Sequence, residues 1–438
     1  MHPLADIGLQ GGSLENAYWG ILVVTYPFIS GLVAGSFVVA SLSHVFGVRK
    51  LDKIAPLALI ASFALLIAAP LTVLSDARQP VNAFELFTRP HIPWSPLGDF
   101  TAIWVTYVVL MTIETYVAFR HENAARALGT GYRARMSRIL ALGSTNLTDA
   151  GRRRDAKLLM VLSSIGILLA FMFHGYIGFV FGAVKARAIW STPLMPVLFI
   201  VSAMVSGIAF MYLLYVVVAR FFREKANLTI TKALLQWLMA FILLDAFLDV
   251  VDLITSGVSA YTQGPVSSGV SSIFLHGPHA FSYLGLQLGV GIVIPVVLWL
   301  VPRVRNCACG GALIAACVVV GVYAMRYNVV LGGQMESKVS SNIVSMSVPI
   351  TGFDSIQTVI GVFAVAFLVF LLFSWMLPWR EAAARPSVHV GHEVDEELAG
   401  GHAEILVEDG KRVAARPALG CRSPAMGASG VGIEGVSS

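Results

Sequence analysis

The sequence predicts an all-α protein that crosses a membrane several times, and two observations carry this prediction. Hydrophobic residues make up 57% of the 438 residues, and charged residues make up 13%, about half of the charged fraction in soluble domains. The hydrophobic residues also gather in runs of about 20 or more, the length that an α-helix needs to cross a hydrocarbon core of about 30 Å. We therefore expect a polytopic membrane protein.

Nine hydrophobic runs reach this length, and we expect each of them to be a transmembrane helix. They lie at residues 18–46, 54–75, 99–119, 157–182, 193–219, 233–256, 277–301, 310–331 and 353–376. The first run contains Gly31 and Gly35, a small-xxx-small pair of the kind that lets transmembrane helices approach closely. This face of the first helix is therefore expected to pack against a neighbouring helix.

Lys and Arg residues are distributed unevenly between the connections. The connections after the first, third, fifth and seventh runs carry 18 of them, and those on the opposite side carry 5. The positive-inside rule therefore places the N-terminus, with segment 1–17, outside and the C-terminus in the cytoplasm. Because the basic excess reports orientation, we expect no nucleic acid as a partner. The long basic connection 120–156 is expected to be a solvated loop near anionic lipid.

The last segment, 380–438, differs in composition from the predicted transmembrane domain, 18–379. It is polar and rich in Ala, Gly, Ser and Glu. A segment of this composition buries too little apolar surface to offset the entropy lost on folding. We therefore expect a disordered cytoplasmic tail.

The end of the fourth run combines buried polar residues with nearby cations, in the stretch FMFHGYIGFVFGAVKARAIW. His174 and Tyr176 lie near the outer membrane surface, where a polar side chain in lipid is costly and indicates a function. Lys185 and Arg187 follow on the side that is otherwise poor in cations, which favours a local role such as binding a negative or electron-rich group. Snorkelling to lipid phosphates is the alternative for these two cations.

The sixth run contains three carboxylates on one face of a helix. Asp245, Asp249 and Asp252 fall at positions i, i+4 and i+7, and this spacing places them above one another. Ionised carboxylates facing lipid would be very costly, so they must face a polar interior. Such a ladder can pass protons, or it can form a structural network with Arg326 of the eighth run; the two are compatible. Glu114, inside the third run, must likewise be protonated, paired or hydrated.

The positions of histidine and cysteine argue against a metal cofactor. A b-type haem needs facing histidines at one depth, but His44 lies at the inner end while His174, His276 and His279 lie at the outer end. The four cysteines contain no Cys-x-x-Cys pair, which a cluster or haem-attachment motif would require. We therefore expect neither haem nor an iron–sulfur cluster in this chain.

Several motifs together resemble the NrfD/PsrC family, the membrane subunits of polysulfide-reductase-like and related respiratory complexes. The most specific is HGYIGFVFGAVKARAIWSTPLMPVLFIVSAMVSG, which begins at His174. The others are ISGLVAGSFVVASL in the first run, LSDARQP at the end of the second, SPLGDF before the third and RYNVVLGGQ in the eighth. SPLGDF lacks the tryptophan that is usual in the family. The resemblance extends over most of the membrane region.

The resemblance implies a fold and a quinone site. The fold would be two adjacent four-helix bundles, 18–182 and 193–331, with the ninth helix, 353–376, added. Menaquinone or ubiquinone would bind near the outer face of the first bundle. The residues implied at this site are Asn16, Asp76, His174 and Tyr176, with the cations Lys185 and Arg187 beside them. His174 or Tyr176 would hydrogen-bond a quinone carbonyl, and Asp76 would accept or supply a proton.

The resemblance also implies partners and a location. An iron–sulfur subunit of the ferredoxin type would dock on the outer face and exchange electrons with the quinone, and further catalytic or cytochrome subunits would complete the complex. This chain would hold no metal, and it would act only within the complex. The location would be the inner membrane of a bacterium or archaeon.

Some relatives are proposed to conserve energy by moving protons, and the chain has residues that would suit such a path. These are the Asp245–Asp249–Asp252 ladder with Arg326, and Glu114 and His44 toward the inside.

Two other functions fit the sequence less well. A proton-coupled secondary transporter would use the carboxylate ladder, but transporters often show matched repeats with broken helices, and no such repeat surrounds Pro27 and Pro295. A structural anchor for an outer enzyme would not need so many buried polar residues.

Overall fold

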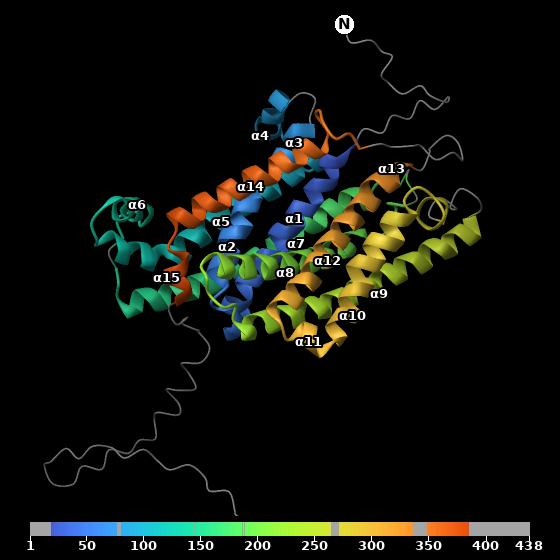
Figure 1. Cartoon of the computed structure of the whole chain (residues 1–438). Coiled ribbons are helices and arrows are strands. Elements are labelled where there is room, and N and C mark those ends of the chain that lie inside the picture. Colours follow the sequence, from blue (N-terminus) through green and yellow to red (C-terminus); the bar gives the residue numbers. More distant parts are fainter. Residues whose placement is uncertain are drawn as a thin grey trace, which may run out of the picture. The chain divides into compact units, whose positions relative to one another are not determined.

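The computed structural model describes residues 19–76, 80–144, 146–185, 187, 189–263, 271–335 and 348–384, with side chains for all of these except 256–263, 271 and 272. Asn16, segment 1–17 and tail residues 385–438 therefore lie outside the described residues. Within the described ranges every regular element is a helix (Figure 1). The prediction of an all-α polytopic membrane protein is confirmed.

Eight helical segments of the described part are long and apolar enough to cross a membrane. They are α1 (Ile21–Phe46), α2 with α3 (Ala55–Ala68, Pro70–Asp76), α5 (Pro96–Ala127), α7 (Asp149–Gly182), α8 (Met195–Phe221), η6 with α10 (Phe281–Val293, Ile294–Leu300), α12 with η7 and α13 (Ala308–Tyr327, Asn328–Gly332, Gly333–Met335) and α14 (Ile356–Met376). In addition, α9 (Leu228–Gln263) includes the whole of the sixth predicted run, 233–256.

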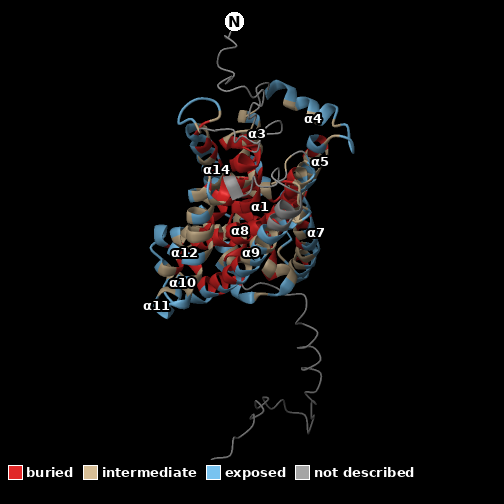
Figure 2. Ribbon diagram, turned by 90° about the vertical axis from the view of Figure 1, so that its right-hand side faces the viewer, coloured by how far each residue is buried: buried red, intermediate tan, exposed pale blue. Residues whose placement is uncertain are grey.

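Short helices occupy several connections. They are η2 (Arg49–Leu51), η3 (Pro80–Phe84), α4 (Glu85–Thr88), α6 (Tyr132–Leu140), η5 (Ser271–Leu275), α11 (Pro302–Arg305) and α15 (Trp379–Ala384). The first residues of the predicted tail, 380–384, are thus helical. Figure 2 shows that α4 and α11 are largely exposed, whereas the residues of α1 and α8 form the buried centre.

We group the long helices into a first and a second bundle, which meet in one central seam. The first bundle contains α1, α2 with α3, α5 and α7, and the second contains α8, α9, η6 with α10, and α12. The bundles meet where α1 and α7 pack against α8, and α14 packs against α2 outside the first bundle (Figure 1). Functional groups on α7 can therefore reach both bundles.

The seam is closed by glycine, as the small-residue pair in the first run predicts. A Cβ atom added to Gly35 of α1 would lie 2.3 Å from the carbonyl oxygen of Ala203 in α8, and one added to Gly207 would lie 2.3 Å from the Cα atom of Gly35. Any larger side chain would push the two backbones apart. Gly31, one turn earlier, faces the ring of His174 instead.

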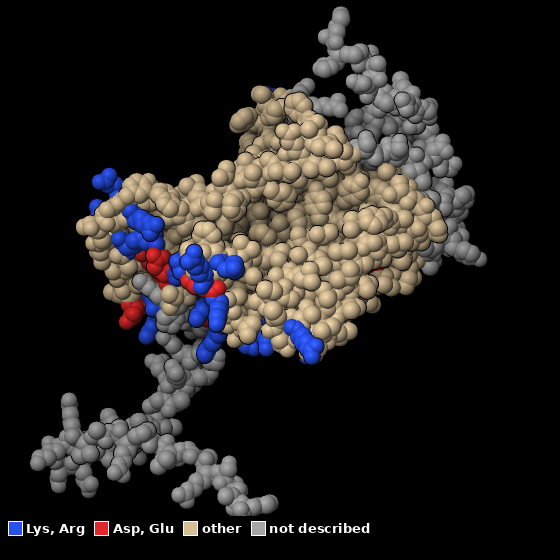
Figure 3. Space-filling view, viewed as in Figure 1, with Lys and Arg blue, Asp and Glu red and all other residues tan. Residues whose placement is uncertain are grey.

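Basic residues mark one end of the molecule, which we call the basic end. Figure 3 shows Lys and Arg side chains gathered near α6, α15 and α11. The connections α1–α2, α5–α7, α8–α9 and α10–α12 lie at this end, and α3, α4 and α13 lie at the opposite end.

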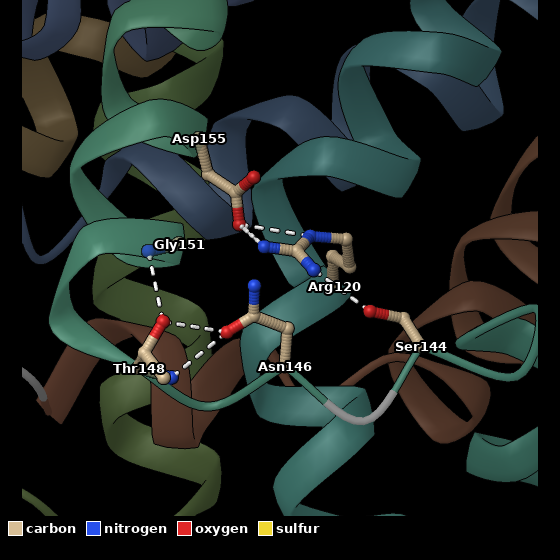
Figure 4. Close-up of polar contacts among 6 residues, drawn as sticks. All are labelled: Arg120, Ser144, Asn146, Thr148, Gly151 and Asp155. Carbon is tan, nitrogen blue, oxygen red and sulfur yellow. Dashed lines mark hydrogen bonds and ion pairs between the residues drawn. The ribbon is translucent and has the colours of Figure 1, made fainter.

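Most of the connection 120–156, expected to be a solvated loop, is helical, and most of its described residues are exposed or half-buried. The end of α5, all of α6 and the first residues of α7 are helical. Thr148 caps α7 by accepting a hydrogen bond from the Gly151 N–H at 3.2 Å, and Asn146 Oδ1 accepts from Thr148 (Figure 4). Such a cap stabilises a helix start by about 1 kcal/mol, so α7 begins at Asp149 rather than at the predicted residue 157.

An ion pair joins α5 to α7 at the basic end. Arg120 of α5 donates to Asp155 of α7 and, at 2.7 Å, to the Ser144 hydroxyl (Figure 4). Both charged side chains are mostly buried. This contact joins α5, which carries Glu114, to α7, which carries His174 and Tyr176.

Candidate functional site

The two most specific candidates, His174 and Tyr176, lie on different faces of α7. Two residues along an α-helix are about 200° apart around its axis, so their side chains point to nearly opposite sides. His174 is fully buried, and Tyr176 is half-buried. The structure therefore places two separate sets of contacts along one helix.

Tyr176 lies in an aromatic cluster between α1, α5 and α7. Its hydroxyl donates to Asp99 Oδ2 at 3.2 Å. The ring of Phe100 lies at the centre of the cluster, with centroids 5.6 Å from Tyr26, 5.2 Å from Phe173 and 6.2 Å from Tyr176. Asp99 Oδ1 is buried and has no hydrogen-bond partner among the described residues. We call these five residues the aromatic cluster. It offers flat ring faces beside a phenol and a carboxyl group.

The other predicted quinone-site residues are spread over the same end of the molecule. Asp76 is half-buried at the end of α3, which packs against α1. Lys185 is exposed in the connection after α7. Arg187 donates from Nη1 to the carbonyl oxygen of Gln334 at 3.0 Å, so part of its hydrogen-bonding capacity holds α13. Asn16 is outside the described residues.

Two tryptophans fix the start of α1 at this end. Trp190 donates from its indole nitrogen to the Val329 carbonyl at 2.6 Å, and its ring stacks on Trp19 with centroids 5.4 Å apart. The Gln334 side chain accepts from the backbone N–H of Trp19 at 3.1 Å and donates to its carbonyl at 2.9 Å. Hydrogen bonds and ring stacking therefore join the start of α1 to η7 and α13.

His174 makes hydrogen bonds with both ring nitrogens. Its Nε2 lies 3.0 Å from Arg326 Nη2, and its Nδ1 lies 3.2 Å from the Ser30 hydroxyl. A guanidinium group only donates, so Nε2 must be the acceptor, and a neutral ring then carries its proton on Nδ1. Ser30 Oγ accepts a hydrogen bond from that N–H, and its own hydroxyl donates to the carbonyl of Tyr26 or Pro27. The contact with Arg326 therefore requires a neutral His174.

Arg326 of α12 is the largest fully buried side chain of the described residues. Besides His174, its Nη2 donates to the Ser202 hydroxyl at 2.6 Å, and its guanidinium carbon lies 4.0 Å from the centre of the Phe199 ring. No ion pair joins Arg326 to a carboxylate of the described residues. Asp245 and Asp249 act on its charge only through longer-range electrostatic interaction.

The carboxylate ladder of α9 continues into a network of amides in the second bundle. Asp249 Oδ2 accepts from Gln287 Nε2 at 3.3 Å, and Gln287 Oε1 accepts from Asn328 Nδ2 at 2.9 Å. Asn328 Oδ1 accepts from the Ser282 hydroxyl and, at 3.0 Å, from His279 Nδ1. Asp245 is buried, and its Oδ1 has no hydrogen-bond partner in the described part of the chain.

A cavity of about 80 Å³ adjoins this network, and we call it the bundle-two cavity. Asp249, Asp252, Gln287 and Asn328 line it, together with residues such as Ile189 and Phe274 from the connections at the end opposite the basic end. A polar cavity needs about 10–15 Å³ for each water molecule, so it has room for several. Sequence reasoning missed Gln287, Asn328 and His279 as members of this network, although amides inside apolar runs were a visible signal.

A second polar cavity lies at the basic end of the first bundle. This bundle-one cavity has a volume of about 130 Å³, and its lining includes His44, Asp52, Glu114, His121, Arg152 and Asp155. Glu114 is 2% exposed; its Oε1 accepts from the Ser163 hydroxyl at 2.6 Å, and its Oε2 has no hydrogen-bond partner within the described ranges. The structure thus places Glu114 and His44 in the lining of one cavity.

Four of the predicted path residues line two separate cavities: His44 and Glu114 line the bundle-one cavity, and Asp249 and Asp252 line the bundle-two cavity. Ser163, the partner of Glu114, lies about 16 Å nearer the basic end along α7 than His174. Tyr107, two turns from Glu114 on α5, packs its ring between Phe37 and Phe173 and is fully buried.

The described residues include no group of three or more His, Cys, Asp or Glu side chains placed to hold a metal ion.

A family model and several known proteins that resemble this chain all point to one family. The family model described as "Polysulphide reductase, NrfD" matches residues 11–337. A selenate reductase subunit of Mesobacillus selenatarsenatis is 30% identical over 74% of this chain and 76% of its own length. The Hdr-like menaquinol oxidoreductase integral membrane subunit of Archaeoglobus fulgidus is 24% identical over 84% and 86%, and Protein NrfD of Escherichia coli is 24% identical over 73% and 96%. The chain belongs to the NrfD family of oxidoreductase membrane subunits.

Proposed function

We propose that this chain is the quinone-reactive membrane subunit of a respiratory oxidoreductase complex. The observation that carries the proposal is the pair of Tyr176 and Asp99 within the aromatic cluster. A quinone head group is a flat ring with two carbonyl oxygens, and a site for it needs ring faces and a hydrogen-bond donor. The buried, unpartnered Asp99 Oδ1 indicates that a further polar group belongs there. A relative named as a menaquinol oxidoreductase subunit favours menaquinone over ubiquinone.

The residues have separable roles in this proposal. When bound, the quinone supplies two-electron, two-proton redox chemistry. Asp99 holds the phenol in position before the quinone binds. Tyr176 then turns its one O–H from Asp99 to a quinone carbonyl oxygen. Asp76, and Asn16 from the preceding segment, are proposed to complete the site, with Asp76 exchanging the proton. His174 would have to release Arg326 or Ser30 before it could contact a quinone, so its direct role needs a separate test.

The proposed partners lie at the end opposite the basic end. An iron–sulfur subunit docks there and exchanges electrons with the quinone, and the complex is completed by a further subunit that carries the catalytic site. A relative named as a subunit of selenate reductase supports this assembly. The protein lies in the inner membrane of a bacterium or archaeon. Its basic end faces the cytoplasm, so the N-terminus lies on the outer side. Lys185 and Arg187 contribute positive charge at the outer side.

Proton movement coupled to the redox reaction is the second part of the proposal. Protons enter the bundle-one cavity from the basic end and reach Glu114 with His44 nearby. They leave through Asp245, Asp249 and Asp252 into the bundle-two cavity. Two polar cavities at opposite ends of the molecule support such a path. A proton-coupled transporter would also need cavities, but the family assignment favours a redox subunit.

Binding of a fluorescent hydroxyquinoline N-oxide, a quinone analogue, to the purified complex tests the site. Tyr176→Phe and Asp99→Asn should each weaken binding about tenfold, the effect of losing one good hydrogen bond. Tyr132→Phe is the matched control, because Tyr132 is exposed near the basic end, where it stacks on Trp375. His174→Gln separates the two faces of α7: unchanged binding would exclude direct contact by His174. Unchanged affinity in both Tyr176→Phe and Asp99→Asn would overturn the proposed location.

A further inference from the structure

The two polar cavities lie in different bundles as well as at opposite ends. The bundle-one cavity is lined by α1, α2, α5 and α7, and the bundle-two cavity is lined mainly by α8, α9, η6 and α12. Protons moving from one to the other would have to cross the seam between the bundles. Any free passage there would dissipate a proton gradient, so the seam must block protons between catalytic events.

Arg326 lies at this crossing. Its guanidinium contacts His174 of the first bundle and Ser202 and Phe199 of the second. It is fully buried, and no described carboxylate pairs with it to neutralise its charge. Asp245 and Asp249, which begin the ladder toward the bundle-two cavity, are the acidic groups that act on it electrostatically.

A buried positive charge without an ion-pair partner repels protons. At about 4 Å, in a protein interior of intermediate polarity, repulsion between two unit charges lowers the local proton population about a thousandfold. Fixed positive groups exclude protons in the same way from channels that conduct water. The contacts of Arg326 keep its charge in place, because His174 Nε2 accepts from it and cannot donate while the ring is neutral.

We propose that Arg326 is an electrostatic barrier that prevents hydronium ions from passing freely between the bundle-one cavity and the bundle-two cavity. This inference rests on the proton path in the proposed function, and it assigns to the buried arginine a role different from quinone binding. It also explains why a cation is kept at the seam although a hydrophobic residue of similar volume would be cheaper to bury.

Passive proton permeability tests the barrier without any redox reaction. The full complex is reconstituted into vesicles that contain a trapped pH-sensitive dye, and a potassium diffusion potential drives protons in the absence of quinone. Arg326→Gln should increase the rate of internal acidification at least about tenfold over the native complex, whereas Arg326→Lys, which keeps the charge, should not. Arg305→Gln is the control, because Arg305 is exposed at the basic end, where its guanidinium lies over Trp299.

A second variant keeps the test valid if Arg326→Gln does not assemble. Ser202→Asp places a carboxylate beside the guanidinium and neutralises its field while retaining its packing, so it should leak as well. Adding Asp249→Asn to either leaking variant should restore a low rate of internal acidification, because it removes a carboxylate through which protons reach the bundle-two cavity. A native rate in vesicles with correctly incorporated Arg326→Gln or Ser202→Asp would overturn the barrier, as would an equal increase in sodium leakage.

The outcome is distinguishable from failure of the proposed function. If the native complex oxidises quinol without any proton uptake from the basic end, the proton path fails whatever the leak rates are. If redox-linked uptake occurs but Arg326→Gln vesicles stay tight, the path stands and the barrier lies elsewhere.

Discussion

The first and last transmembrane helices, α1 and α14, bury very different fractions of their surfaces. In the most apolar window of α1, 83% of the residues are buried, whereas in that of α14, which is the more hydrophobic helix, 17% are buried. In a soluble protein the more hydrophobic helix would be the more buried one. In a bilayer, lipid tails are as apolar as leucine, so hydrophobicity alone does not drive helices together. Small and polar residues decide which helix is central.

The residues of the two helices show this difference directly. Gly35 of α1 lies against the backbone of α8, and Ser30 of α1 accepts a hydrogen bond from His174 of α7. In α14, Gly361 has no atom within 4 Å of the position that a Cβ would occupy. The same residue type is therefore a packing requirement in one helix and a surface residue in the other.

A pair of matched substitutions tests this comparison with the largest expected effect. Gly35→Val should destabilise the complex by about 3 kcal/mol, because the backbone of α8 cannot yield as a flexible side chain would. Gly361→Val should change stability little, since a Cβ at this position would meet no neighbouring helix within 4 Å. Thermal unfolding of the purified complex, followed by loss of the monodisperse peak in size-exclusion chromatography, measures both. Similar midpoints for the two variants would mean that the α1–α8 contact does not limit stability.

The close approach of α1 was predictable from sequence, and its partner was not. Gly31 and Gly35 identify a packing face, because only small residues permit contact between helix backbones. Nothing in the apolar sequence of α8 shows that Gly207 is opposite. The pattern of Asp245, Asp249 and Asp252 likewise predicted a shared face, since helical spacing is a local property.

The partner of Arg326 shows a harder limit of sequence reasoning. Carboxylates were expected to pair with it, because charge complementarity is the simplest rule for a buried cation. Its closest partners are instead a neutral histidine and a serine hydroxyl from the seam, His174 and Ser202. Which helices adjoin one another sets these contacts, and the order of hydrophobic runs does not reveal that arrangement. The same limit hid Asp99 as the partner of Tyr176.

Substitution of His174, which contacts Ser30 of the central helix α1, should have an intermediate effect on stability. His174→Ala should destabilise the complex by about 2 kcal/mol, because a buried guanidinium loses a hydrogen-bond acceptor. His174→Gln should recover most of this loss, since its amide oxygen can accept from Arg326. Thermal unfolding at pH 7 measures both variants. If His174→Ala were as stable as the native protein, the Arg326 contact would not contribute to the seam.

The smallest effect is expected where α14 continues into α15 at the basic end. Glu381 of α15 accepts a hydrogen bond from Arg126 of α5 at 2.6 Å. Partial burial alone would raise the pKa of Glu381, but the hydrogen bond and charge of Arg126 hold the pKa below its usual value of 4.5. A carboxylate with a lowered pKa in the folded state stabilises the fold above its unfolded pKa, and this contribution is lost as pH falls through the lowered value.

This ion pair should therefore tether α15 at neutral pH and release it in acid. Hydrogen exchange of the α15 amides should be slow at pH 7 and should accelerate, relative to the intrinsic rate, as pH falls below 4.5. Glu381→Gln should show the faster relative exchange at both pH values. Because the Glu381 side chain is 54% exposed, solvent screens the pair and the unfolding midpoint of the whole complex should hardly change. A large change in that midpoint would show that α14 and α15 contribute to the core as much as α1 does. It would contradict the conclusion that small and polar contacts make α1 central and leave α14 peripheral.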